Sequence, residues 1–125
     1  MDNGDQIRIL VETEYLDEQS DPEDERYVFS YRIQIHNPGE QAATLRSRHW
    51  FITNGNAEVQ EVKGEGVVGE QPRIVPGDSF DYTSGAVLST PVGSMHGYYV
   101  MESDDGRLFH ASIPVFTLAA TYALN

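Results

Sequence analysis

The feature that most constrains the fold is a two-residue alternation of apolar and polar side chains. Between Tyr27 and Ile35 every odd position is aromatic or aliphatic, and most positions between them are polar. This period is typical of a strand with one buried face. Further segments that read as strands cover residues 7–15, 44–53, 57–63 and 80–86, and no stretch shows the 3.6-residue period of an amphipathic helix.

The C-terminal part of the chain predicts a register that agrees with its apolar pattern. A three-residue loop at 104–106, with Gly106 left-handed, would join the last two strands. It would place the large apolar residues on one face, pairing Met101 with Phe109, Tyr99 with Ala111, Gly97 with Ile113 and Met95 with Val115. The whole chain is therefore predicted to be all-β, an antiparallel β-sandwich of seven to eight strands. We expect its core to contain Trp50, Phe29, Tyr31, Ile33 and Tyr99.

Turn signals separate these segments. Asn54-Gly55 is the dipeptide most favoured in tight hairpins and would close the third strand onto the fourth. Pro76-Gly77-Asp78 supplies a turn before residues 80–86. Residues 17–25 carry six acidic side chains and Pro22, so they are predicted to form an exposed loop.

Length, charge and cysteine usage exclude several classes of protein. The 125 residues suit a single domain, 1–125, with a core over about residues 7–118. There are no cysteines, which fits a reducing cytoplasm. The net charge of −12 repels nucleic acid. No signal peptide and no apolar run of about 20 residues is present, so we expect a cytoplasmic protein without membrane insertion.

The string Gly64-Glu65-Gly66-Val67-Val68-Gly69 has the glycine spacing of a dinucleotide-binding loop. A Rossmann loop must open a helix, whereas Pro72 and Pro76 follow here, so no such fold is expected. Two interpretations remain. The loop amides could form an anion-binding nest, aided by Arg48, His49 or Arg73. Alternatively, the glycines allow a tightly turning crossover between strands, which is favoured because Glu65 and Glu70 would repel a phosphate.

The histidines do not predict a tight metal site. His96 would face Pro114, four residues from His110, so the two imidazoles begin about 13 Å apart. His49 lies on another strand and His36 at a strand end. The acidic loop 17–25 would bind a divalent cation only weakly. We expect no cofactor, no resident metal and no catalytic residue, since Ser84 lacks the context of a nucleophile elbow.

Five segments resemble the ApaG family: Ser47-Arg48-His49-Trp50, residues 66–72, Tyr82-Thr83-Ser84-Gly85, residues 90–101 and Ile113-Pro114-Val115-Phe116. The resemblance covers about residues 7–118. It implies an immunoglobulin- or fibronectin type III-like sandwich and a link to cobalt resistance and magnesium efflux. A sandwich without a membrane span cannot itself move ions across a bilayer, so this link would be indirect.

Two hypotheses for function follow. The first is a non-enzymatic module that binds a protein partner, with the chain itself a monomer or weak homodimer. The second is a small-ligand protein that holds a divalent cation or a pyrophosphate-containing nucleotide at Gly64–Gly69. Both place the binding residues in one region: Arg48, His49, Trp50, Gly64, Gly66, Gly69, Glu70 and Gln71.

Overall fold

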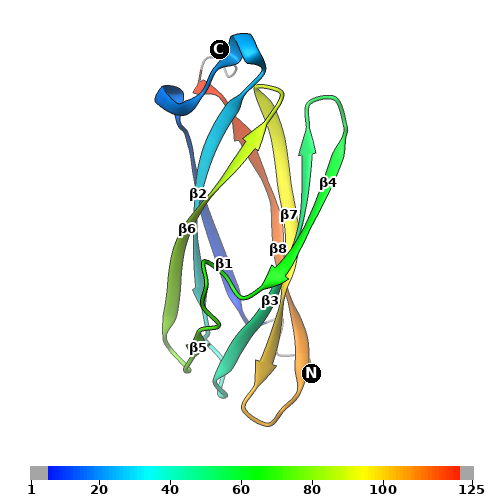
Figure 1. Ribbon diagram of the computed structural model, residues 1–125. Coiled ribbons are helices and arrows are strands. Elements are labelled where there is room, and N and C mark those ends of the chain that lie inside the picture. The colour runs from blue at the N-terminus through cyan, green and yellow to red at the C-terminus, as the bar shows by residue number, and fades with distance from the viewer. Residues whose placement is uncertain (1–5, 122–125) are drawn as a thin grey trace.

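The computed structural model describes residues 6–121, which form two antiparallel β-sheets packed face to face (Figure 1). The smaller sheet has the order β1 (Arg8–Tyr15), β2 (Tyr27–His36), β6 (Ser79–Leu88). The larger sheet has the order β4 (Val59–Glu65), β3 (Ala43–Asn54), β7 (Val92–Ser103), β8 (Leu108–Ala119), and the short β5 (Arg73–Ile74) pairs with the start of β3. The predicted antiparallel sandwich is confirmed.

The core lies between the sheets and is rich in aromatic rings. Trp50 is 2 % exposed and meets Tyr31 edge-on, with the ring centroids 5.5 Å apart. Tyr99 lies on its other side at 6.3 Å and is fully buried. Phe29 and Ile33 are buried too, so the predicted core is confirmed. The alternation seen in the sequence arises because odd residues of β2 point into this layer.

The two long sides of the sandwich differ. On one side β1 contacts β8, and Ile9, Val11 and Tyr15 of β1 are half-buried against the core. On the other side the edge strands are β6 and β4, and Figure 1 shows the segment between β4 and β5 lying across this side. This segment contains the end of the glycine string and joins two strands of the larger sheet.

The last hairpin follows the predicted register over most of its length. Met101 pairs with Phe109 and Tyr99 with Ala111, and Gly106 has a φ of 87°. The prediction fails at the far end, where a β-bulge shifts the register between Met95 and Gly97, so that Pro114 and Val115 of β8 together lie opposite His96. Met95 therefore pairs with Phe116 and not with Val115. Phe116 packs against the core, whereas Val115 is 67 % exposed.

Two further local predictions need correction. The loop after β3 is not a two-residue Asn-Gly turn. Ala57 has the positive φ, 63°, and the Asn54 side-chain oxygen accepts from the backbone amides of Asn56 and Glu58. The acidic segment is exposed as predicted, but it is ordered as two short 3-10 turns, Asp17–Gln19 and Pro22–Asp24. The turn at Gly77 is confirmed by its φ of 84°.

Candidate functional site

The glycine string ends in a two-residue hairpin turn. Val67 and Glu70 exchange backbone hydrogen bonds of 2.8 and 2.9 Å. The two residues between them, Val68 and Gly69, have φ values of 45° and 81°. Two positive φ angles in a two-residue loop are the mark of a type I′ turn, which usually contains Asn-Gly. A β-branched residue is rare in this conformation, so Val68 is strained.

Gly66 and Gly64 are each required for a different structural reason. Gly66 has a φ of 62°, and a Cβ there would come within 2.2 Å of the Glu70 carbonyl oxygen. Gly64 lies opposite Arg48 in the β3–β4 ladder, and a Cβ there would come within 2.6 Å of the Arg48 guanidinium. The string is therefore required by close contacts and backbone conformation, as the crossover interpretation predicts.

Arg48 fixes the start of the crossover. Its Nη1 donates to the carbonyl oxygens of Glu65 and Gly66, at 3.0 and 2.9 Å. Within residues 6–121 no carboxylate lies within 4.0 Å of this guanidinium, unlike those of Arg32, Arg46 and Arg73. The two carbonyls orient the guanidinium without neutralising it, so Arg48 keeps a positive charge and further donors for a ligand.

Three amides of the loop already donate hydrogen bonds within the protein. Gly66 N donates to the Arg46 carbonyl, at 2.9 Å. The amides of Val67 and Glu70 are used within the hairpin. These three amides are therefore not available to a phosphate in this conformation.

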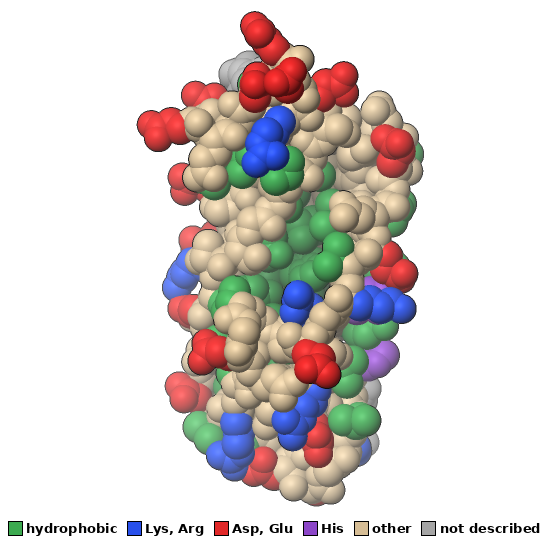
Figure 2. Space-filling model, in the orientation of Figure 1, with side chains coloured by type: hydrophobic (Ala, Val, Ile, Leu, Met, Phe, Trp, Pro, Cys, Tyr) green, Lys and Arg blue, Asp and Glu red, His purple; other side chains and the backbone are tan. Residues whose placement is uncertain are grey.

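A pocket of about 290 Å³ opens between the sheets beside this crossover. Figure 2 shows a hollow with hydrophobic side chains running down this face of the molecule. The pocket is lined by residues of both sheets and of the crossover: Tyr31, Arg48, Trp50, Glu65, Val67, Val68, Gly69, Tyr82 and Ser84. It is the place where loop, guanidinium and core meet.

Tyrosine hydroxyls form the inner wall of this pocket. Burial raises the pKa of Tyr31, while its hydrogen bond with Ser84 and the Arg48 charge act in the opposite direction. Burial also raises the pKa of Tyr82 and of Tyr99, whose hydroxyls are 2.5 Å apart. All three hydroxyls therefore remain protonated near neutral pH, and the only positive charge on the pocket wall is that of Arg48.

The predicted site residues do not form one surface. Glu70 and Gly69 are exposed on the turn. Gln71 follows the turn: its Oε1 accepts from Arg46 Nη1, and its Nε2 donates to the Arg46 carbonyl oxygen. Trp50 is buried in the core and supports the loop from within. His49 points to the outer face of the larger sheet, where Nε2 lies 2.7 Å from Glu61.

One cluster was missed from the sequence. On the outer face of the larger sheet, rings from three strands stack in a row, with neighbouring centroids 4.3 to 5.1 Å apart: His96, Phe51, His49, Tyr98 and His110. These residues share the outward parity of their strands, which was the available signal. The aromatic rings separate the imidazoles, and no group of three His, Asp or Glu suited to a metal ion occurs in the described residues.

Comparison with known proteins identifies the family. The model of the ApaG domain matches residues 17–103. Protein ApaG of Azoarcus sp. (strain BH72) is 56 % identical over the full length of both chains, and that of Acidithiobacillus ferrooxidans is 59 % identical over 92 % of this chain and 91 % of its own. The crystal structure of the putative ApaA protein from Bordetella pertussis has a TM-score of 0.90 at 46 % identity, covering 92 % of this chain and 94 % of its own.

These comparisons agree with the five motifs and with the sandwich described above. Over residues 6–121 none of the helical segments could cross a bilayer, because none is long and apolar enough. The family model spans both strands around the glycine string and the strained turn itself. The chain belongs to the ApaG family.

Proposed function

We propose that this chain is a non-enzymatic, cytoplasmic binding module of the ApaG family that acts through a protein partner. The contact surface is the turn at residues 67–70, with Glu70 and Val68 at its tip and Arg48 behind it. An influence on cobalt and magnesium levels would pass through that partner. An immunoglobulin- or fibronectin type III-like scaffold suits this role, because such sandwiches bind through loops on a rigid frame.

The strained and exposed Val68 carries this proposal. Its φ is 45° and its side chain is 54 % exposed, so the turn displays an apolar group in an unfavourable conformation. Backbone strain of this kind costs about 1 to 3 kcal/mol and concentrates at binding sites. Buried Val67, beside it, anchors the turn in the core. The strain is thus held in place by packing, as expected for a surface selected for recognition.

Internal contacts support a preorganised surface. Arg48 binds two carbonyls at the start of the crossover, and Gln71 binds Arg46 at its end. A loop held at both ends loses little conformational freedom on binding, which favours affinity. Because of the Arg48 bonds, replacing Arg48 by alanine would loosen the loop as well as remove a contact group.

Affinity capture from a cell extract of the source organism tests the proposal. Glu70→Ala removes an exposed side chain from the turn, and Glu23→Ala removes the same group from the acidic segment at the other end of the molecule (Figure 1). We expect Glu70→Ala to reduce capture of a protein that wild type and Glu23→Ala retain equally, with all melting temperatures alike. Equal capture by all three would show that the turn is not the contact surface.

A further inference from the structure

One strand edge of the sandwich lacks the usual protection against pairing with another chain. Within the described residues β6 pairs only with β2, so every second residue turns its backbone amide and carbonyl outward. Residues 82–88 contain neither a charged side chain nor a proline. Exposed edges are normally guarded by such residues, because they otherwise accept a further strand.

The other edges are guarded. The opposite edge strand on this side, β4, carries Glu61, Lys63 and Glu65 within seven residues. On the far side of the sandwich β1 contacts β8, and β8 contains Pro114. The unprotected edge is therefore specific to β6. It borders the side of the sandwich between β6 and β4, which we call the open side.

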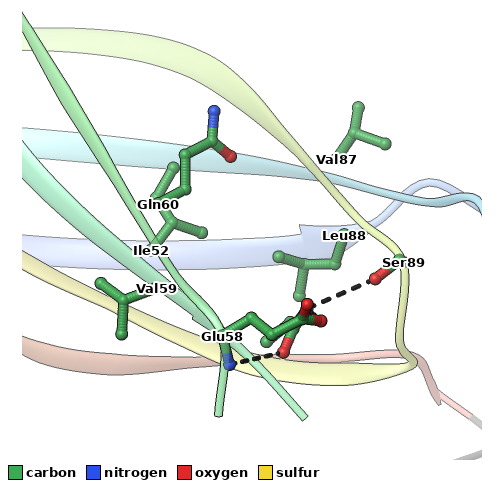
Figure 3. Close-up of a pocket in the computed structure, with 8 residues that line it drawn as sticks. Ile52, Glu58, Val59, Gln60, Val87, Leu88 and Ser89 are labelled. Carbon is green, nitrogen blue, oxygen red and sulfur yellow. Dashed lines mark hydrogen bonds between the residues drawn. The ribbon is translucent and has the colours of Figure 1, made fainter. Parts of the chain in front are cut away.

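Two pockets follow each other along this open side, next to β6. The first is the pocket beside Arg48, which includes Ser84. The second, of about 370 Å³, includes Leu88 of β6 and Ile52 of β3, together with Glu58, Gln60 and Ser89 (Figure 3). Ser84 and Leu88 are four residues apart on one strand, or about 13 Å. A strand added to β6 would direct alternate side chains into both pockets.

The chemistry of the pockets indicates which side chains they suit. At the second pocket Ile52 and Leu88, which have the inward parity of their strands, form an apolar wall for a side chain, whereas Glu58, Gln60 and Ser89 make the rest of the lining polar. The first pocket is lined by Arg48, Ser84 and Glu65, and no described carboxylate, that of Glu65 included, lies within 4.0 Å of the Arg48 guanidinium. A carboxylate there would receive charge-assisted hydrogen bonds.

We propose that the open side binds an extended segment of a partner protein, which pairs with the edge of β6 over Ser84–Leu88 and places an acidic side chain on Arg48. An apolar side chain four residues away fills the second pocket. Main-chain pairing supplies affinity and the two pockets supply specificity, as in other strand-addition complexes. This inference rests on the proposed function, since it specifies how the module holds its partner.

Selection of a random octapeptide display library on the full chain tests this inference. We expect the enriched peptides to contain an Asp or Glu with an apolar residue four positions away. Replacing that Glu by Gln should weaken binding about tenfold or more, as expected for loss of a charged hydrogen bond. Methylating the peptide amides that face β6 should abolish binding, while methylating the alternate amides should not.

Amide hydrogen exchange of the wild-type protein locates the contact. Exchange should slow at alternate residues of 83–88 when a selected peptide is bound. Three results would overturn the inference: failure to select any peptide, a loss of affinity well below tenfold on replacing Glu by Gln, or equal binding by both series of methylated peptides. Protection confined to residues 66–71 would also overturn it, yet would leave the binding module proposed above intact.

Discussion

The guanidinium of Arg48 lies over Gly64, in the space that any side chain at that position would occupy. The two residues are partners across the β3–β4 ladder, and the guanidinium continues to the carbonyls of Glu65 and Gly66. The first glycine of the string thus serves the arginine rather than a nucleotide. This relationship links the sequence motif to the pocket between the sheets.

Gly64→Ala should displace Arg48 and lower the free energy of unfolding by about 1 to 3 kcal/mol, because the bonds to two carbonyls are lost. A double-mutant cycle with Arg48→Ala measures the cause. We expect Gly64→Ala to cost much less in the Arg48→Ala background, as read from urea unfolding. If the two free-energy losses were additive, the position of the Arg48 guanidinium would not depend on the absence of a side chain at residue 64.

Gly66→Ala should be more damaging than Gly69→Ala. Both residues have positive φ, which costs about 1 kcal/mol for alanine. At Gly66 the new Cβ also meets the Glu70 carbonyl at 2.2 Å, whereas at Gly69 nothing lies within 4 Å. Thermal unfolding of the two variants gives the comparison. A smaller loss for Gly66→Ala would contradict the described hairpin.

Val68→Asn should stabilise the protein. The replacement creates Asn-Gly, the dipeptide favoured in type I′ turns, and relieves the strain of a β-branched residue at a φ of 45°. We expect a gain of about 1 kcal/mol and a melting temperature a few degrees higher. Val115→Asn is the control, since Val115 is similarly exposed at 67 % but lies in β8. A loss of stability in Val68→Asn would show that the turn is not strained.

Alkaline pH should destabilise the fold through its buried tyrosines. Burial raises the pKa of Tyr82 and Tyr99 above the ordinary value of 10.0, so above that pH the unfolded chain releases protons that the folded chain retains. Stability is therefore full below about pH 10 and declines as pH rises beyond it. The double variant Tyr82→Phe/Tyr99→Phe should show a shallower decline in urea unfolding from about pH 9 to 11. An unchanged slope would refute the assignment to this pair.

Much of the fold could be predicted from the sequence, because burial in a sandwich repeats every two residues. The alternation in β2 located the core around Phe29 and Ile33, and the glycine at 106 set the register of the last hairpin. The bulge at His96 was not predictable in this way. An extra residue changes the parity of a strand without leaving any mark in its composition.

The candidate site was less predictable. The glycine spacing marked the crossover, but a valine at the first position of a type I′ turn contradicts local preference, so the turn at Val68 was missed. The two pockets next to β6 lie between β6 and β4, two edge strands that belong to different sheets, so the sequence pattern of either strand alone does not predict them. Trp50 was assigned both to the core and to the binding surface; in the structure it is 2 % exposed and also lines the pocket beside Arg48.

The most direct test of the binding surface is partner capture by Val68→Asn, measured beside its melting temperature. The account predicts that this variant is more stable than wild type and yet captures several-fold less partner, because the exposed apolar tip has been replaced. Val115→Asn, in β8 and outside the proposed surface, should leave the tip, and therefore its contact, in place. Undiminished capture by a stabilised Val68→Asn variant would contradict the claim that this strained turn is the binding surface.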